Sequence, residues 1–411
     1  YLPDAMKSGL VSEKEIDEVV RGNLRVMLKL GLMDNGPDNP YVSIGIEDTV
    51  KPWTKPEAAA LARKATVESI VLMKNDGLLP IKKEKIKSIA VIGPRADAVI
   101  SDWYAGTPPY AVSILVAIQN AVGKGVDVHF APDNKADAAI LAARDADAAI
   151  VCVGNHPLSY GLDWGQNQVA SDGREEVDRQ AISLEQEDLV KLVKKANPRT
   201  VLVLVSSFPY AIPWSKENVP AILHVAQSSQ ELGNGVADIL FGIASPAGRL
   251  VQTWPKSIDQ LPPMLDYNIR NGRTYMYEKE EPLFAFGHGL SYTAFEYGNL
   301  RVDRAAIKDG ETAGITVDVK NTGPMDSDEV VQLYVRFPGS KMERPAKALK
   351  GFKRVHIPKG RSVTVRLPLK AEDLKYWNEG RHGWVLETGR VELMIGAASN
   401  DIRLTGKIDA R

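Results

Sequence analysis

The stretch "AAIVCVG", residues 148–154, is a run of small and β-branched apolar side chains that ends in glycine. A strand with no polar position is typical of a sheet that is covered on both faces. Three more runs share this pattern: "IAVIG" (89–93), "VLVLVSS" (201–207) and "AILHVAQ" (221–227). Amphipathic helical stretches near 135–145 and 184–196 lie between them. The alternation predicts a largely parallel α/β sheet.

Ligands of open parallel sheets bind beyond the carboxyl ends of the strands. Gly93, Asn155 and Ser206 stand at those ends in this sequence. We therefore expect the loops that follow them to share one rim and to carry the functional residues: 94–110, 155–180 and 206–214.

The pattern differs on either side of this region. Before it, Ser12 and Glu15 form a capping box at the start of a predicted helix over 12–32. A linker rich in Asp, Asn, Gly and Pro (33–53) precedes a second predicted helix over 55–74. After residue 300, four runs alternate apolar and polar residues with period two: "GITVDVKN", "EVVQLYV", "SVTVRLPL" and "RVELMIGA". Such runs predict an immunoglobulin-like β-sandwich.

Composition narrows the function classes. The chain has 411 residues, enough for two to three domains, with 51 basic and 52 acidic side chains. Because the charges balance, the composition gives no sign of a basic surface that would bind nucleic acid or anionic lipid. No apolar stretch is long enough to span a membrane. The single cysteine, Cys152, is expected to be a buried, inert thiol. Because the chain begins at Tyr1, without Met, we expect a processed product or a piece of a longer protein.

No cofactor or metal is expected. The sequence has no P-loop, no GxGxxG after the strand at 89–93, and no GxSxG elbow. Its six histidines form no metal-binding spacing, and one cysteine cannot make a cysteine-type metal site. Of the kinds of catalytic site considered, one based on carboxylate side chains remains.

The densest group of carboxylates is "SDGREEVDR", residues 171–179, on the loop after the run at 148–154. A general acid needs a raised pKa, which neighbouring carboxylates provide, whereas arginines beside it lower that pKa. The segment contains both kinds of residue: Asp172, Glu175, Glu176 and Asp178 with Arg174 and Arg179. The alternative is a solvated charged loop that precedes the helix near 184.

A second candidate is Asp102, in "SDW" at residues 101–103. As the nucleophile of a retaining glycosidase it would lie about 5–5.5 Å from the acid. The following "AGTPPY" favours instead an aspartate that makes turn hydrogen bonds. His156 can act as a base, as a sugar hydrogen-bond donor, or structurally. Trp103 and Trp164 can stack on sugar rings or pack within the protein.

The motifs resemble those of the family 3 glycoside hydrolases, which are retaining β-glucosidases, β-xylosidases and relatives. "SGLVSEKEIDEVVRGNLRVMLKLGLMD" is similar to the closing helix of that family's N-terminal (β/α)₈ barrel. "ESIVLMKNDGLLPI", "IAVIGPRAD", "QELGNGVADILFGIASPAGRLVQTWP" and "GRTYMYEKEEPLFAFGHGLSYTAF" resemble its six-stranded α/β sandwich. "VDVKNTGPMDSDEVVQLYV", "ALKGFKRVHI" and "ASNDIRL" resemble its fibronectin type III-like domain.

The resemblance implies a fold and an order of domains. The fold is an α/β sandwich with a mostly parallel sheet between helices, followed by an all-β fibronectin type III-like sandwich. The N-terminal helix would be the remnant of a barrel. The implied parts are the end of the barrel (1–35), a linker (36–68), the α/β sandwich (69–245), a wrapping segment (246–298) and the fibronectin-like domain (299–411).

The resemblance also implies roles for single residues. The family's nucleophile is an aspartate in an "SDW"-like motif at the end of a barrel strand. Here the motif follows the first strand of the sandwich, and it resembles that domain's "WYSGTPP" loop, which borders the active site. Asp102 is therefore not expected to be the nucleophile. Trp103 and Tyr104 are expected to bind substrate. The nucleophile and the Lys-His and Arg sugar ligands would lie in the barrel.

The acid/base of the family is often a glutamate three residues before an Asp-Arg pair, which is the place of Glu175 in "EEVDR". Family members commonly have Gly or Ala where Glu176 stands, so Glu176 is a second candidate. His156 and Trp164, in "VGNHP…WG", are implied as substrate-binding residues. This arrangement is closest to members that act on short β-glucosides or β-xylosides.

The implied function is that of a retaining, exo-acting β-glycosidase, first of all a β-glucosidase on short oligosaccharides. The alternatives are a β-xylosidase and a non-catalytic carbohydrate-binding or assembly module. The expected partners are a β-linked oligosaccharide or glycoside and the barrel, on a preceding segment or a separate chain. A homodimer stays open as a further partner. Polysaccharide-degrading relatives suggest a periplasmic or secreted location.

Overall fold

The structure, a computed structural model, describes residues 1–33, 39, 43–46, 50–100, 106–132, 135–155, 181–226 and 229–411. These residues form two units, Tyr1–Ala59 and Ala60–Arg411. The first unit contains α1 (Leu2–Lys7), α2 (Glu13–Lys29) and the short helix η1 (Pro52–Thr54). At the start of α2, the Glu15 amide donates to the Ser12 hydroxyl and the Ser12 amide donates to the Glu15 carboxylate. The capping box predicted from the sequence is confirmed.

The prediction of one helix over 55–74 is wrong at its C-terminal end. The helix α3 spans Pro56–Ser69, and the strand β1 (Val71–Asn75) follows after one residue. Val71, Leu72 and Met73 are buried, and Val71 and Leu72 pair in antiparallel orientation with the strand β6. A short apolar run has no periodicity that distinguishes a strand from a buried helical turn, so tertiary pairing decided its conformation.

The second unit begins with a six-stranded sheet. Its other strands are β2 (Ser88–Ile92), β3 (Asp127–Ala131), β4 (Ala149–Gly154), β5 (Thr200–Val205) and β6 (Ala221–Val225). The spatial order is β1-β6-β5-β4-β2-β3. All neighbours are parallel except β1 and β6, so the mostly parallel sheet is confirmed. The strand β2, which contains most of "IAVIG", is expected from the sequence to be the first strand of the sandwich. It is the second in chain order, because β1 precedes it.

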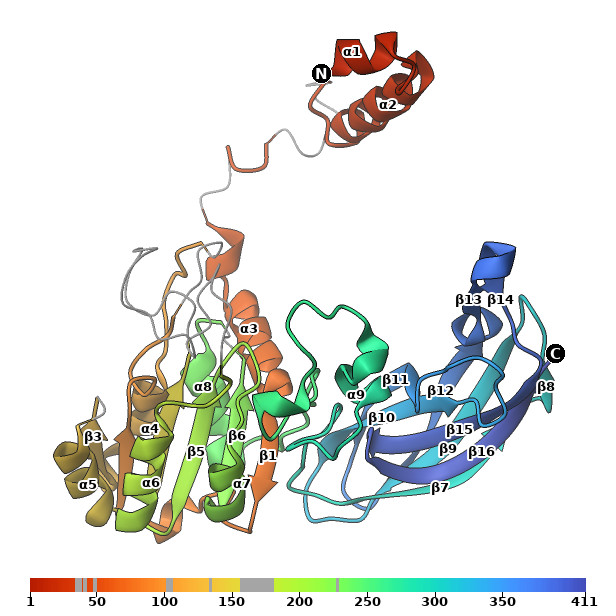
Figure 1. The fold of residues 1–411 in the computed structure, drawn as a ribbon. Helices are drawn as coiled ribbons and strands as arrows, with labels where there is room; N and C mark the ends of the chain where they lie inside the picture. The colour runs from red at the N-terminus through yellow and green to blue at the C-terminus, as the bar shows by residue number, and fades with distance from the viewer. Residues whose placement is uncertain are drawn as a thin grey trace. The chain divides into compact units, whose positions relative to one another are not determined.

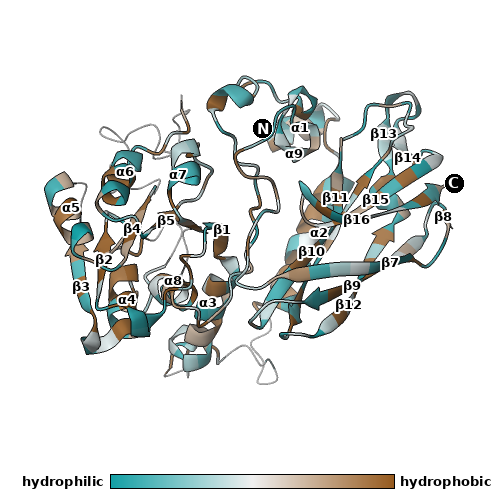
Figure 2. Cartoon of the chain, turned by 90° about the horizontal axis from the view of Figure 1, so that it is seen from below, coloured by the Kyte–Doolittle hydropathy of each residue, from teal (hydrophilic) through white to brown (hydrophobic). Residues whose placement is uncertain are grey.

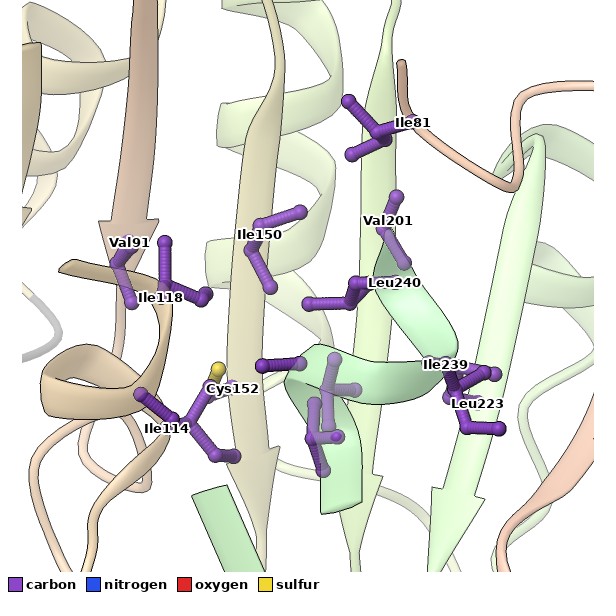
Figure 3. Packing of buried hydrophobic residues seen from close by; sticks show 14 of the residues in the cluster. Ile81, Val91, Ile114, Ile118, Ile150, Cys152, Val201, Leu223, Ile239 and Leu240 are labelled. Atoms are coloured by element: carbon purple, nitrogen blue, oxygen red, sulfur yellow. The ribbon is translucent and has the colours of Figure 1, made fainter. Parts of the chain in front are cut away.

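Helices cover both faces of this sheet, as its apolar strands predict (Figure 1). On one face, α4 (Ile114–Val122) and α8 (Leu232–Leu240) pack against side chains such as Ile150 and Cys152 (Figure 3). On the other face, a second core joins the sheet to three helices: α5 (Ala136–Arg144), α6 (Glu187–Ala196) and α7 (Pro213–Asn218). The sheet therefore forms the middle of three layers.

The segment after α8 crosses the second face of the sheet and leads to the β-sandwich. Trp254 pairs with the chain at Leu283 and Phe284 through backbone hydrogen bonds of 2.7–3.1 Å. The Trp254 ring is buried and lies edge-on to His224 of β6 at 5.1 Å. This segment contains the short helix α9 (Thr274–Tyr277). The backbone pairing of Trp254 and its contacts with the His224 and Phe284 rings hold the segment against the sheet.

The C-terminal part is an all-β sandwich with the predicted period-two burial. One sheet has the order β11-β10-β15-β16-β8 and the other β12-β9-β7, while β13 and β14 form a separate two-stranded antiparallel sheet. Ile315, Val317 and Val319 are fully buried while the residues between them are partly exposed. In Figure 2 the strands of the sandwich carry both hydrophilic and hydrophobic segments. The strands are β7 (Phe295–Val302), β8 (Ala306–Ile307), β9 (Thr312–Asn321), β10 (Ser327–Arg336), β11 (Ala348–Ile357), β12 (Ser362–Lys370), β13 (Tyr376–Asn378), β14 (Gly383–Val385), β15 (Gly389–Ala398) and β16 (Asp401–Ala410).

A buried ion pair joins the two domains of this unit. The Arg249 Nη2 atom lies 2.7 Å from Oε1 of Glu329 on β10, and the two side chains are 9% and 4% exposed. An ion pair removed from water stabilises little by itself. Loss of one partner, however, leaves the other charge buried and unpaired.

We expect Glu329→Ala to lower the free energy of unfolding by about 3–5 kcal/mol, because the Arg249 guanidinium then stays buried without its counter-charge. Urea unfolding followed by tryptophan fluorescence measures the change. The control is Glu392→Ala, which breaks an ion pair with Arg336 whose side chains are 25% and 50% exposed. That change should cost about 1 kcal/mol or less. Equal effects of the two substitutions would contradict the prediction.

Candidate active site

The strand order places a topological switch point between β2 and β4. These two strands are neighbours and run parallel. From β2 the chain continues through α4, on one face, to the edge strand β3. From β4 it continues through α6, on the other face, to β5. The two connections therefore leave the sheet in opposite directions, and such a switch point is where open α/β sheets bind ligands.

Two glycines allow the chain to leave the sheet at this point. Gly93 follows β2 with φ +106°, and Gly154 ends β4 with φ +132°. A Cβ atom on Gly93 would stand 2.5 Å from the carbonyl oxygen of Cys152, and the position on Gly154 is tighter still against Val205. Both positions combine a backbone conformation unsuited to L side chains with direct contact to the neighbouring strand. The two glycines therefore determine the direction in which the backbone leaves β2 and β4.

The loop after β4 is anchored at both of its described ends. At the start, the Asn155 amide donates to the Val205 carbonyl at 3.1 Å, and the Asn155 side-chain oxygen accepts from the Ser207 amide at 3.2 Å. Asn155 is 1% exposed. At the end, the Ala211 amide donates to the Ile182 carbonyl at 2.7 Å. Both ends are thus tied to the loop that follows β5, as a shared rim requires.

The loop after β2 is anchored to the start of α8. The Tyr110 hydroxyl donates to Oε1 of Glu231 at 2.5 Å, and the Asn234 side-chain amide donates to the other oxygen at 2.6 Å. The hydrogen bond to Glu231 raises the pKa of Tyr110. Glu231 is 5% exposed, so its carboxylate is a buried, fully engaged anchor. The sequence analysis missed both residues, because no local motif links positions 121 apart in the chain.

A second contact fixes the same loop on the other side. The Ser113 hydroxyl donates to the Asp97 carboxylate at 2.6 Å and also accepts from the Val116 amide at the start of α4. The Leu115 amide donates to the Ala96 carbonyl at 2.9 Å. Residues 96–97 and 113–115 therefore close the base of the loop, with 98–112 between them.

The predicted site residues lie outside the described residues. This holds for Glu175, Trp103, Tyr104, His156 and Trp164. It also holds for the other carboxylates considered above: Asp102, Asp172, Glu176 and Asp178. What the structure gives is the place where their segments begin and end. The segment 101–105 belongs to the loop after β2, and 156–180 belongs to the loop after β4.

The described histidines and the cysteine near the sheet are structural. The Nε2 atom of His224 lies 3.1 Å from the Ser206 carbonyl, and burial lowers the pKa of His224 to about 4. Cys152 is buried, as predicted, and burial raises the pKa of its thiol. Among the described residues no group of three or more His, Cys, Asp or Glu side chains could hold a metal ion. Within the same residues, no helix has the length and apolarity to cross a membrane.

Comparison with known proteins finds matches for both domains of the chain. Residues 70–292 match the glycosyl hydrolase family 3 C-terminal domain, and residues 329–399 match a fibronectin type III-like domain. The chain is 32% identical to a β-xylosidase of Formosa agariphila over 97% of its own length and 56% of that protein. It is 31% identical to a periplasmic β-glucosidase of Salmonella typhimurium over 98% of its length and 56% of that protein.

A solved structure shows the same fold. The β-D-glucoside glucohydrolase from Trichoderma reesei superposes with a TM-score of 0.85 at 27% identity, over 100% of this chain and 62% of that one. The chain spans a little over half the length of the curated relatives named above. The two matched domains and their order agree with the motifs found in the sequence. The chain belongs to glycosyl hydrolase family 3.

Proposed function

We propose that this chain supplies the general acid/base of a retaining, exo-acting β-glycosidase, with terminal β-D-glucosyl residues of short oligosaccharides as the first substrate. Glu175 protonates the departing glycosidic oxygen, and then removes a proton from the water that hydrolyses the glycosyl-enzyme. The nucleophilic aspartate comes from the N-terminal barrel, on a preceding segment or a partner chain. We place the enzyme in the periplasm or outside the cell, where one relative's name also places that protein.

The observation that carries this proposal is the common origin of the two loops. The segment with Glu175 leaves from β4 and the segment with Trp103 leaves from β2, and these strands are neighbours at the switch point. An acid on one loop and aromatic rings on the other suit a glycoside whose leaving group stacks while its oxygen is protonated. Trp103, Tyr104, Trp164 and His156 are proposed to bind the substrate.

β-Xylosidase is the second candidate, because relatives with that name are as similar to this chain as those named β-glucosidase. The two sugars differ in the C6 hydroxymethyl group. A site that hydrogen-bonds this group rejects xylosides, because its polar partners then stay unpaired.

The test compares nitrophenyl β-glucoside and nitrophenyl β-xyloside in a barrel-complete enzyme, in which this chain follows the N-terminal barrel that the resemblance implies. We expect kcat/KM for the glucoside to be at least about 10-fold higher, a difference of about 1.4 kcal/mol in transition-state binding. A preference for the xyloside would select the second candidate. Hydrolysis of neither, by a folded protein, would favour a carbohydrate-binding or assembly module.

A further inference from the structure

The end of the loop after β2 lies in backbone contact with the start of α8. The Val112 amide donates to the Gln230 carbonyl at 2.8 Å, and the Gly233 amide donates to the Val112 carbonyl at 2.9 Å. A Cβ atom on Gly233 would stand 2.0 Å from the carbonyl oxygen of Ser113. The two segments are therefore so close that no side chain fits between them at this point.

A side-chain hydrogen bond joins the same two segments. The Tyr110 hydroxyl donates to Oε1 of Glu231 at 2.5 Å. Tyr110 is 38% exposed. Burial holds so open a ring only weakly, because the stabilisation from burial scales with the apolar area that is removed from water. The hydrogen bond to Glu231 is therefore the contact that decides the orientation of Tyr110.

The acceptor of this hydrogen bond belongs to a rigid part of the fold. The Glu231 amide donates to the Ser229 hydroxyl at 3.1 Å, and that hydroxyl lies 3.0 Å from the hydroxyl of Thr66 on α3. Further along, Arg63 of α3 donates to both carboxylate oxygens of Asp238 on α8 at 2.6–2.7 Å. Because α3 and α8 are tied together in this way, Glu231 can hold the loop in place and does not move with it.

Tyr110 is close in the chain to the proposed substrate-binding residues. It stands five residues after the segment 101–105, nearer to it than the contacts of residues 112–115 at the base of the loop. Removal of the Tyr110 hydroxyl leaves those base contacts in place. The change therefore acts on the loop and not on the anchoring of α4 or the sheet.

We propose that Tyr110 and Glu231 are positioning residues that set how strongly the loop after β2 binds the leaving group of the glycoside. The inference rests on the proposed function, in which Trp103 and Tyr104 of this loop bind the substrate. Tyr110 and Glu231 act through the loop, so their effect is confined to steps in which the leaving-group position is occupied.

One such step is transfer of the glycosyl group to a second sugar. In a retaining enzyme the glycosyl-enzyme reacts with water. An acceptor sugar in the leaving-group position competes with that water. The bond between C1 and the nucleophile breaks, a bond between C1 and the acceptor oxygen forms, and the acid/base takes the proton of the acceptor hydroxyl. The ratio of transfer product to hydrolysis product therefore measures acceptor binding, and it does not depend on the amount of folded enzyme.

The barrel-complete enzyme tests the proposal with dinitrophenyl β-glucoside as donor and methyl thio-β-glucoside as acceptor, which O-glycosidases cleave slowly. We expect Tyr110→Phe to lower the transfer ratio at least about threefold, because a misplaced binding loop weakens acceptor binding. With methanol as acceptor, which is too small to need the loop, the ratio should stay unchanged. The kcat for hydrolysis of the donor should stay within about twofold, because the departure of dinitrophenol precedes the attack by water that limits this rate.

The matched control is Tyr292→Phe, which removes a hydroxyl that donates to the Ile239 carbonyl at 2.9 Å near the other end of α8. It should keep the transfer ratio of the unchanged enzyme. Glu231→Ala should lower the ratio as Tyr110→Phe does, and the double variant should be no worse than Glu231→Ala, since both changes remove one hydrogen bond. If Glu231→Ala does not fold, Tyr110→Phe decides the result.

The outcomes separate this inference from the proposed function. An unchanged transfer ratio in Tyr110→Phe, or an equal loss in Tyr292→Phe, would overturn the positioning role and leave the glycosidase assignment standing. Failure of the unchanged, folded enzyme to release dinitrophenol would overturn both.

Discussion

Replacement of Glu175 by alanine in a barrel-complete enzyme should lower kcat on an unactivated β-glucoside about 10²–10⁴-fold, the usual contribution of a positioned acid/base. With a dinitrophenyl glucoside the leaving group needs no proton, so the glycosyl-enzyme still forms but water attacks it slowly. Azide needs no base. Added azide should therefore break the bond between C1 and the nucleophile and yield the β-glucosyl azide, restoring part of the rate.

The matched control is Glu176→Ala, which removes the adjacent carboxylate. It should keep kcat within a few-fold of the unchanged enzyme and form no glycosyl azide. The product is identified by chromatography and NMR. The ionisation of the general acid should be lost from the pH dependence of the rate in Glu175→Ala and should remain in Glu176→Ala. Full activity of Glu175→Ala, or azide rescue only in Glu176→Ala, would move the acid/base role to another residue.

The second large effect is expected for the 411-residue chain by itself. It should show no measurable turnover of an aryl β-glucoside, at least about 10⁵-fold below the barrel-complete enzyme. Catalytic groups that act as a unit lose nearly all of their effect when one is absent. In the proposed mechanism the nucleophile, whose attack forms the intermediate, comes from the barrel.

The assay needs a chain that is shown to be folded by circular dichroism and shown by intact mass to carry no co-purified partner. Addition of the barrel as a separate polypeptide is the positive control. Turnover by the pure 411-residue chain would contradict the division of the catalytic pair. It would then direct the search for a nucleophile to carboxylates of this chain, with Asp102 as the first.

The fold could be predicted to a large extent because its strongest signals are local. The run at 148–154 is apolar at every position, and the structure buries all of β4 between two helical layers. The capping box at Ser12 is likewise complete within four residues. By contrast, residues 71–73 are equally apolar, and the sequence analysis places them in a helix. Their strand conformation depends on pairing with β6, about 150 residues later in the chain.

The candidate site could be predicted only in part. The positions of the carboxyl ends of the strands predicted which loops lie along one edge of the sheet. The hydrogen bond between Asn155 and Ser207 joins the loops after β4 and β5, in agreement with that prediction. The hydrogen bond from Tyr110 to Glu231 was not predicted, because it joins residues 121 positions apart and neither has a motif of its own for this role. The roles of Glu175 and the aromatic residues stay predictions.

The sequence by itself determined which segments are strands with two buried faces, which alternate in a sandwich, and which family the motifs resemble. These properties can be read from the order of apolar and polar side chains, because each pattern is complete within a short stretch of the chain. Only the tertiary structure decided that β1 runs antiparallel at the sheet edge, and that β2 and β4 are neighbours with connections on opposite faces. Strand order depends on contacts between distant residues, and no local pattern records it.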